Sequence, residues 1–116
     1  VVLEELVNAQ RRGAQVYGLV TGYASRADAN HLTAPDREGR GLACAMEAAL
    51  EDAGLKKPDY INAHGTGTIY NDAMETRAVK LALGPAAYDT PMSSIKAMLG
   101  HSFGAGGASS DCARAK

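Results

Sequence analysis

The sequence has few aromatic residues and no excess of charge of either sign. It contains no tryptophan, and aromatic residues occupy 5% of its 116 positions, so we expect no aromatic surface on which nucleic-acid bases stack. Its 12 basic and 13 acidic side chains give a net charge of -1. This balance lacks the basic patch of a nucleic-acid-binding protein, and we expect no nucleic-acid partner.

Long apolar runs and clustered cysteines are also missing. No stretch approaches the ~18 consecutive apolar residues of a membrane-spanning helix, and no charged-then-apolar start resembles a signal peptide. We therefore expect a soluble, cytoplasmic protein with no membrane partner. Cys44 and Cys112 are too few and too irregularly placed for a disulfide framework or a zinc site, which favours a reducing compartment. Cys44 lies near the apolar face of a predicted helix and is interpreted as a small buried residue, whereas Cys112 lies in a polar tail without a visible base.

The sequence does contain an alternation of strand-like and helix-like segments. Strands are predicted at residues 1–3, 16–24, 59–61 and 91–95, and helices at 4–12, 39–53 and from 71 or 72 to about 83. The long polar segment 25–38 is predicted to be a loop, and loops of this length often carry function. This order predicts an α/β fold with a mostly parallel sheet and helices on its faces. The apolar start of the chain suggests part of a larger fold.

The segment NAHGTGT, residues 62–68, directly follows one of the predicted strands. Open α/β folds tend to place their chemistry at the carboxyl ends of buried strands, so His64 is the first candidate site residue. The two glycines allow a ligand to approach the backbone closely, and Thr66 and Thr68 each offer a hydroxyl that donates and accepts hydrogen bonds. The segment matches neither a Walker loop nor a dinucleotide-binding fingerprint.

A second candidate segment, KAMLGH at residues 96–101, follows the last predicted strand. Because the carboxyl ends of parallel strands lie side by side, His64 and His101 are predicted to meet in one pocket. Two imidazoles aimed at one oxygen could donate hydrogen bonds to a developing oxyanion, or one could act as a base. Lys96 needs a partner if it is buried, and Glu75, in the first turn of the following helix, is the obvious carboxylate. No third ligand accompanies the two histidines, so no metal site is expected.

Each of these residues also has a purely structural interpretation. His31 lies in the polar loop and is interpreted as a surface or satisfied core residue. Glu75 alone is equally well explained as a carboxylate that favours the helix dipole, and with Asp72 it has the spacing of a loose capping box. A functional role is favoured for His64 because glycine and threonine surround it. It is favoured for His101 because this residue ends a Lys-x-x-x-Gly-His pattern.

Taken together, these motifs resemble a specific family. NAHGTGT followed by ND and Glu75, with SSIKAMLGH and a glycine- and alanine-rich turn after it, is similar to the carboxyl-terminal half of β-ketoacyl synthases of the thiolase superfamily. VVLEEL and GLVTGYASRADANHLTAPDREGRGL resemble the elongating type II ketosynthases of fatty acid and aromatic polyketide synthesis. The resemblance runs from residue 1 to about Gly107 and implies a partial thiolase-like αβαβα fold, with residues 1–116 as part of the carboxyl-terminal domain. Residues 108–116 form an atypical polar tail where the family continues an apolar helix.

The resemblance implies a decarboxylative Claisen condensation, in which malonyl-acyl carrier protein loses carbon dioxide and the resulting enolate attacks an acyl thioester. By motif, His64 and His101 would hold the malonyl thioester carbonyl, and Lys96 would pair with Glu75. Thr66 and Thr68 would contact the phosphopantetheine arm of the carrier protein. No cofactor beyond that arm is implied. The implied partners are acyl carrier protein and a second ketosynthase subunit, in a homodimer or a heterodimer.

The sequence also departs from the family in ways that leave alternatives open. The family's nucleophilic cysteine belongs to an amino-terminal motif that these 116 residues do not contain, so we expect the chain alone to be inactive. We also expect it to be poorly soluble, because strands made for a larger core would expose apolar faces and open edges. A non-catalytic partner similar to a chain-length factor is one alternative, although such partners tend to lose the histidines that this sequence keeps. An inactive fragment with a pantetheine pocket is another. The choice between fatty acid and polyketide synthesis stays open.

Overall fold

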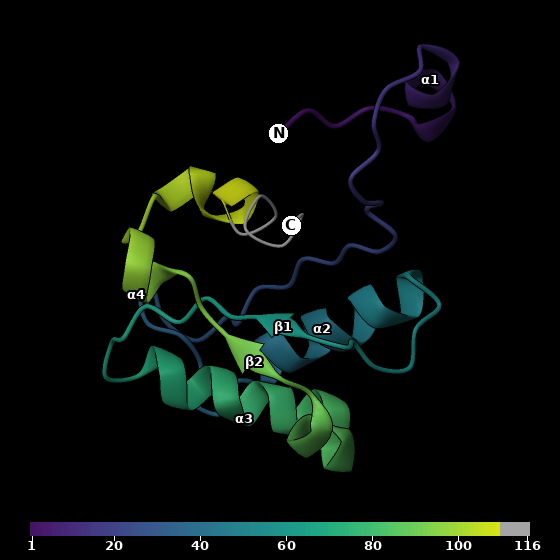
Figure 1. The fold of residues 1–116 in the computed structure, drawn as a ribbon. Coiled ribbons are helices and arrows are strands. Elements are labelled where there is room, and N and C mark those ends of the chain that lie inside the picture. The colour runs from purple at the N-terminus through teal and green to yellow at the C-terminus, as the bar shows by residue number, and fades with distance from the viewer. Residues whose placement is uncertain (110–116) are drawn as a thin grey trace.

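The computed structural model of the protein describes residues 1–109 (Figure 1). The elements in chain order are α1 (Leu6–Arg11), α2 (Arg40–Asp52), β1 (Ile61–Asn62), α3 (Asn71–Leu83), the 3₁₀ helix η1 (Gly84–Asp89), β2 (Met92–Ser93), α4 (Lys96–Leu99) and the 3₁₀ helix η2 (Phe103–Ala105). Strands β1 and β2 pair in parallel, with Ile61 opposite Met92 and Asn62 opposite Ser93. The predicted α/β organisation and the parallel pairing are confirmed.

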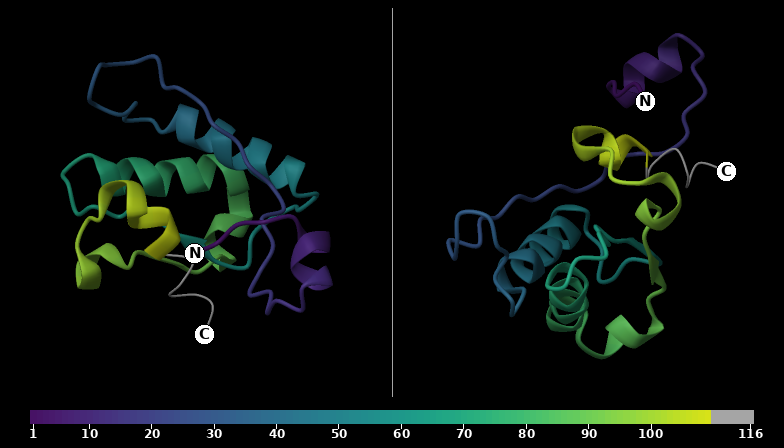
Figure 2. Two further views of the ribbon diagram at one scale, coloured as in Figure 1. Left: turned by 90° about the horizontal axis from the view of Figure 1, so that it is seen from above. Right: turned by 90° about the vertical axis from the view of Figure 1, so that its left-hand side faces the viewer.

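The core lies between α2 and α3, which pack against each other on the same side of the sheet (Figures 1 and 2). Small residues allow this close approach, because Ala43 of α2 and Ala78 of α3 are both buried. A Cβ atom on Gly39, at the amino-terminal end of α2, would lie only 2.8 Å from the carbonyl oxygen of Met74. Glycine at this position therefore lets the chain enter α2 in contact with the backbone of α3.

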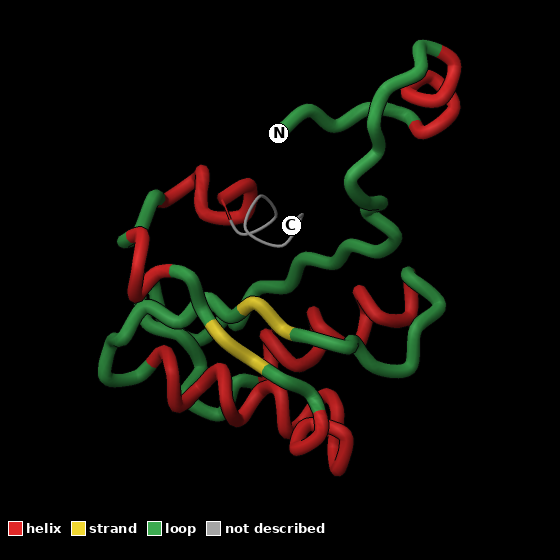
Figure 3. Tube along the Cα trace, viewed as in Figure 1, coloured by secondary structure: helices red, strands yellow, loops and turns green. Residues whose placement is uncertain are grey.

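Two of the predicted strands are wrong. Residues 1–3 and 16–24 have no strand structure, and Figure 3 draws both as loop. Their apolar side chains are exposed, with Val2 at 84% and Val20 at 76%. A segment of high β propensity forms a strand only when a neighbouring strand satisfies its backbone, and β1 and β2 pair only with each other in the described residues.

Segment 16–24 runs instead along the carboxyl-terminal end of α2. A Cβ atom on Gly22 would lie 2.3 Å from the carbonyl oxygen of Ala49, and the backbone N–H of Tyr23 donates to Asp52 Oδ2 at 2.9 Å. One glycine contact and one side-chain hydrogen bond therefore hold an otherwise extended segment beside the helix. The loop predicted at 25–38 is confirmed and leads from this segment into α2.

The three predicted helices are confirmed, although α1 is shorter than the predicted 4–12. The capping box is wrong. Helix α3 begins after Tyr70, and no side chain caps its first turn. Asp72 accepts hydrogen bonds from the backbone N–H of Gly67 and from the side chain of Asn71. The interpretation of Cys44 as buried is also wrong, because the 100° turn per helical residue directs the neighbouring Ala43 into the core and leaves Cys44 exposed.

Two sequence interpretations lie outside the described residues, namely that of Cys112 and that of the polar tail beyond residue 109. Within residues 1–109, no helix has the length and apolar character that a membrane span requires.

Candidate active site

The carboxylate of Glu75 anchors the HGTGT loop to α3. The side chain is buried, at 4% exposure. Its Oε1 accepts a hydrogen bond from the backbone N–H of His64 at 2.6 Å, and its Oε2 accepts from the backbone N–H of Gly65 at 2.8 Å and from Asn71 Nδ2 at 2.9 Å. Three donors therefore converge on one carboxylate, a strong arrangement because hydrogen bonds to an ionised acceptor are about twice as strong as neutral ones.

The other side of the loop packs against the segment that leaves β2. Gly65 has φ +48°, and a Cβ atom there would lie 2.3 Å from the Cβ atom of Ser94. Ser94 Oγ donates to the carbonyl oxygen of His64 at 3.4 Å. A side chain at residue 65 would therefore be both strained and in collision, which explains why glycine follows His64.

The two imidazoles that were predicted to meet lie next to each other. The ring centroids of His64 and His101 are 5.3 Å apart, with an interplanar angle of 84°. His101 Nδ1 accepts a hydrogen bond from the backbone N–H of Phe103 at 3.0 Å, so the neutral ring carries its proton on Nε2. Both residues are exposed. Residues 37 positions apart in the sequence thus present a pair of imidazoles at one edge of the parallel sheet.

The predicted ion pair between Lys96 and Glu75 is not formed, and this corrects the sequence interpretation. The ion pairs in the described residues join Arg12 to Glu4, Arg40 to Asp36 and Arg77 to Glu38. The oxygens of Glu75 are instead used by two backbone amides and Asn71. Lys96 is half-buried at the start of α4, and its backbone N–H donates to Ser94 Oγ at 3.3 Å.

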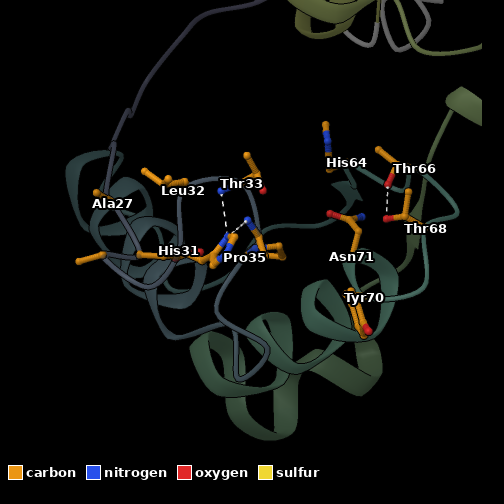
Figure 4. A pocket seen from close by; sticks show the side chains of 13 residues that line it. Ala27, His31, Leu32, Thr33, Pro35, His64, Thr66, Thr68, Tyr70 and Asn71 are labelled. Carbon is orange, nitrogen blue, oxygen red and sulfur yellow. Dashed lines mark hydrogen bonds between the residues drawn. The ribbon is translucent and has the colours of Figure 1, made fainter.

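His64, Thr66 and Thr68 line one wall of a cleft of about 680 Å³, together with Tyr70 and Asn71 (Figure 4). The hydroxyls of Thr66 and Thr68 are 3.1 Å apart and hydrogen-bond to each other. His101 does not line this cleft. The imidazole pair therefore lies at the border of the cleft, because His64 lines the cleft and His101 does not.

The opposite wall comes from loop residues 27–35, including His31. His31 Nδ1 accepts hydrogen bonds from the backbone N–H groups of Thr33 and Ala34, both at 3.2 Å (Figure 4). Sequence reasoning interpreted His31 as a surface or core residue and so missed its place at the cleft. The length of the loop was the signal that pointed to it, because long ordered loops often close over a ligand.

Carboxylates organise the base of this loop. Asp28 Oδ2 accepts from the backbone N–H of Asp36 at 2.9 Å. Asp36 in turn accepts from the backbone N–H of Glu38 and from Arg40 Nε, both at 3.1 Å. The hydrogen bond from the backbone of Glu38 is the main reason that the pKa of the Asp36 carboxyl lies below its usual value. Desolvation opposes this effect, and the Arg40 guanidinium adds to it. The folded loop therefore favours the ionised form of Asp36.

Comparison with known proteins shows the family to which the chain belongs. Residues 17–113 match the family described as beta-ketoacyl synthase, C-terminal domain. The chain belongs to the β-ketoacyl synthase family. It is 53% identical over 108 residues to 3-oxoacyl-[acyl-carrier-protein] synthase 2 of Synechocystis sp., a match that covers 91% of this chain and 26% of the relative. It is 55% identical over 106 residues to a putative polyketide beta-ketoacyl synthase 1 of Streptomyces virginiae, covering 90% of this chain and 25% of the relative.

Solved ketosynthase structures share the fold. The chain superposes with a TM-score of 0.90 and 37% identity on a structure described as a type II polyketide synthase acyl carrier protein in complex with its ketosynthase, AntDE:AntF, covering 97% of this chain and 28% of that one. The ishigamide ketosynthase/chain length factor gives a TM-score of 0.83 at 42% identity, covering 95% and 27%. The predicted thiolase-like α/β fold is confirmed, and this β-ketoacyl synthase chain spans about a quarter of the length of its curated relatives.

Proposed function

We propose that this chain supplies the two-histidine part of a β-ketoacyl synthase active site that catalyses decarboxylative Claisen condensation. The observation that carries the proposal is the 5.3 Å separation of the His64 and His101 rings beside a cleft with two threonine hydroxyls. Family membership supports the same reaction, because relatives at 53% and 55% identity are named as 3-oxoacyl-[acyl-carrier-protein] and polyketide ketoacyl synthases.

In this reaction the malonyl thioester loses its carboxylate as carbon dioxide, and the bonding electrons move into an enolate. The enolate carbon then attacks the carbonyl carbon of an acyl group held as a thioester on a cysteine, and the cysteine leaves as a thiolate. The role proposed for His64 and His101 is to donate N–H hydrogen bonds to the malonyl thioester oxygen while it gains negative charge. The Nε2 proton of His101 is already available as such a donor.

The proposed substrates are carried on the phosphopantetheine arm of acyl carrier protein, with Thr66 and Thr68 in contact with that arm. The solved complex of a related ketosynthase with its acyl carrier protein supports this partner. A second ketosynthase subunit or a chain length factor is the proposed partner in a dimer, as the ketosynthase/chain length factor structure suggests. The cytoplasm is the proposed location, and no separate cofactor is proposed.

A chimaera tests the reaction directly. The matching quarter of the Synechocystis synthase is replaced by this chain, and ketoacyl product from acyl- and malonyl-acyl carrier protein is measured. We expect activity in the chimaera and a loss of about 100-fold in His64→Ala or His101→Ala, the scale of removing one oxyanion donor. Lys57→Ala, an exposed change remote from the cleft, serves as the control. Full activity without either histidine contradicts the proposal.

The alternative of a non-catalytic partner makes a different prediction in the same assay. A chain of this kind would associate with a ketosynthase without supporting condensation, whatever residue stands at positions 64 and 101. The retention of both imidazoles, and their mutual approach, favours the catalytic proposal. An inactive fragment with a pantetheine pocket would bind the arm and give no product in any context.

A further inference from the structure

The side-chain amide of Asn71 is held in one orientation at the wall of the cleft. Its Nδ2 donates to Glu75 Oε2 at 2.9 Å and to Asp72 Oδ1 at 3.1 Å. Ionised carboxylates only accept hydrogen bonds, so the amide nitrogen of Asn71 lies on their side and its oxygen, Oδ1, on the other. Figure 4 shows this oxygen on the side of the loop that carries His31. Asn71 therefore presents a fixed hydrogen-bond acceptor to the cleft.

His31 has the opposite polarity on the facing wall. Two backbone N–H groups, of Thr33 and Ala34, point at its Nδ1, which must be unprotonated to accept them. The neutral ring consequently carries its proton on Nε2, at the far edge of the imidazole. In the part of the chain that the structure describes, this Nε2 has no hydrogen-bond partner. His31 thus presents a fixed donor, as Asn71 presents a fixed acceptor.

We propose that Asn71 Oδ1 and His31 Nε2 are amide-recognition groups, accepting from amide N–H and donating to amide C=O of a ligand that lies along the cleft. A secondary amide is a neutral group that carries one donor and one acceptor in fixed directions. The pantetheine arm contains two such amides, so a single extended ligand satisfies both walls. This inference rests on the proposed function and adds two specificity-determining residues to the threonine contacts already given.

The charges behind Asn71 favour a neutral ligand over an anion. Both hydrogen atoms of its Nδ2 are directed at carboxylates, those of Asp72 and Glu75, and this polarises the amide so that Oδ1 becomes a better acceptor. The same two carboxylates repel a phosphate group brought to that wall. The amide portion of the arm, rather than its phosphate, is therefore the part expected beside Asn71.

The test is a chemical double-mutant cycle on the 116-residue chain. Binding of pantetheine is followed by NMR, with two analogues in which an ester oxygen replaces one or the other amide N–H. For the unmodified chain we expect one analogue to bind about three- to tenfold more weakly, the scale of one neutral hydrogen bond. In Asn71→Ala that difference disappears, whereas in Asn8→Ala, the same change on α1 away from the cleft, it persists. Protection of the His64 and Gly65 amides reports whether Asn71→Ala keeps the loop in place.

His31 is tested by a variant that separates its two roles. The variant His31→Asn keeps a side-chain oxygen that accepts from the Thr33 and Ala34 amides but removes the Nε2 donor. We expect pantetheine binding about three- to tenfold weaker with the loop resonances unchanged. At about pH 8, where a histidine is ordinarily neutral, nitrogen chemical shifts of the unmodified chain should show the Nε2–H form of His31.

Several results overturn the inference. The first is an equal loss of affinity for the ester analogues in the unmodified chain and in Asn71→Ala, and the second is an Nδ1–H form of His31. The third is no pantetheine binding up to about 10 mM, a concentration at which a ligand with a millimolar Kd is largely bound. Failure here is distinguishable from failure of the proposed function. A chimaera that needs both catalytic histidines but is indifferent to Asn71 and His31 keeps the reaction and removes this inference. If the chain binds pantetheine in a way that depends on Asn71 but gives an inactive chimaera, the inference stands and the proposed reaction is contradicted.

Discussion

Replacement of Glu75 by glutamine has a specific predicted effect, because the two carboxylate oxygens of Glu75 accept unequal numbers of hydrogen bonds. Oε1 faces the amide of His64 alone, whereas Oε2 faces the amide of Gly65 and Asn71 Nδ2. In Glu75→Gln only one terminal atom remains an acceptor. The glutamine satisfies two donors by placing its oxygen toward Gly65 and Asn71, which turns its NH₂ group against the N–H of His64. The damage should therefore appear at His64 first.

The expected magnitude follows from the loss of one hydrogen bond to a charged acceptor. Such bonds contribute about 1.5–3 kcal/mol, and leaving a buried donor unsatisfied costs a similar amount. We therefore expect the local opening free energy at His64 to fall by about 2 kcal/mol, which corresponds to about 30-fold faster amide exchange. The amide of Ala63 donates to the Ser93 carbonyl at 2.8 Å, without contact to Glu75, and is the internal reference.

Amide hydrogen exchange measured by NMR, at the same pH for both proteins, decides the matter. The exchange rate of the His64 amide should rise while that of Ala63 changes less than about threefold. Glu47→Gln, an exposed carboxylate on α2, is the matched control and should shift neither, since such surface changes are usually within about 0.5 kcal/mol. Equal acceleration at His64 and Ala63 would mean global destabilisation, and no acceleration at His64 would mean that Glu75 does not hold the loop; either refutes the reasoning.

Further predictions concern the backbone, the acid response and the exposed apolar segment. Gly65→Ala should lower the free energy of unfolding by about 2–4 kcal/mol in urea titrations, because the new Cβ atom collides with Ser94. Gly67 has φ +72° and nothing within 4 Å of a Cβ atom, so Gly67→Ala should lower the free energy of unfolding by only about 1 kcal/mol, through backbone strain. Because the pKa of Asp36 is lowered in the folded chain, its stabilising effect is present above the ordinary aspartate pKa near 3.8 and lost as pH falls below it; Asp36→Asn should remove this acid transition from loop amide chemical shifts. Val20→Lys, at a 76% exposed position, should reduce concentration-dependent association in sedimentation experiments, and unchanged association would show that segment 16–24 is not responsible.

Local sequence signals predicted those elements that this chain stabilises by itself. Helix α2 was recognisable from apolar spacing and from the glycine that follows it, and α3 from its apolar face and the Gly84-Pro85 end. The strand predicted at 16–24 is wrong because strand propensity describes a fit to a neighbouring strand, and the described residues provide no such neighbour. Residue type alone could not distinguish a paired strand from an extended loop.

At the site, strand order predicted which side chains would approach but not which partners they would choose. His64 and His101 meet because β1 and β2 are parallel neighbours, a property of topology. The partner of Glu75 could not be predicted in the same way. Charge favoured Lys96, but the turn after β1 directs two backbone amides at the carboxylate, and a backbone hydrogen bond is invisible to a comparison of side-chain charges.

The orientation of the two imidazoles and their electrostatic strength have different physical origins. Orientation comes from bonds within this chain, because Glu75 and Ser94 hold the backbone of His64 and the Phe103 amide holds the ring of His101. Strength depends on the surroundings, since a hydrogen bond to a developing oxyanion is weakened in water and strengthened where water is excluded. Both rings are exposed here. The chain by itself is therefore expected to show the ring-to-ring contact in solution but weak stabilisation of an oxyanion. A covering protein surface should strengthen that stabilisation without moving either histidine, while the cysteine nucleophile has to come from outside these 116 residues.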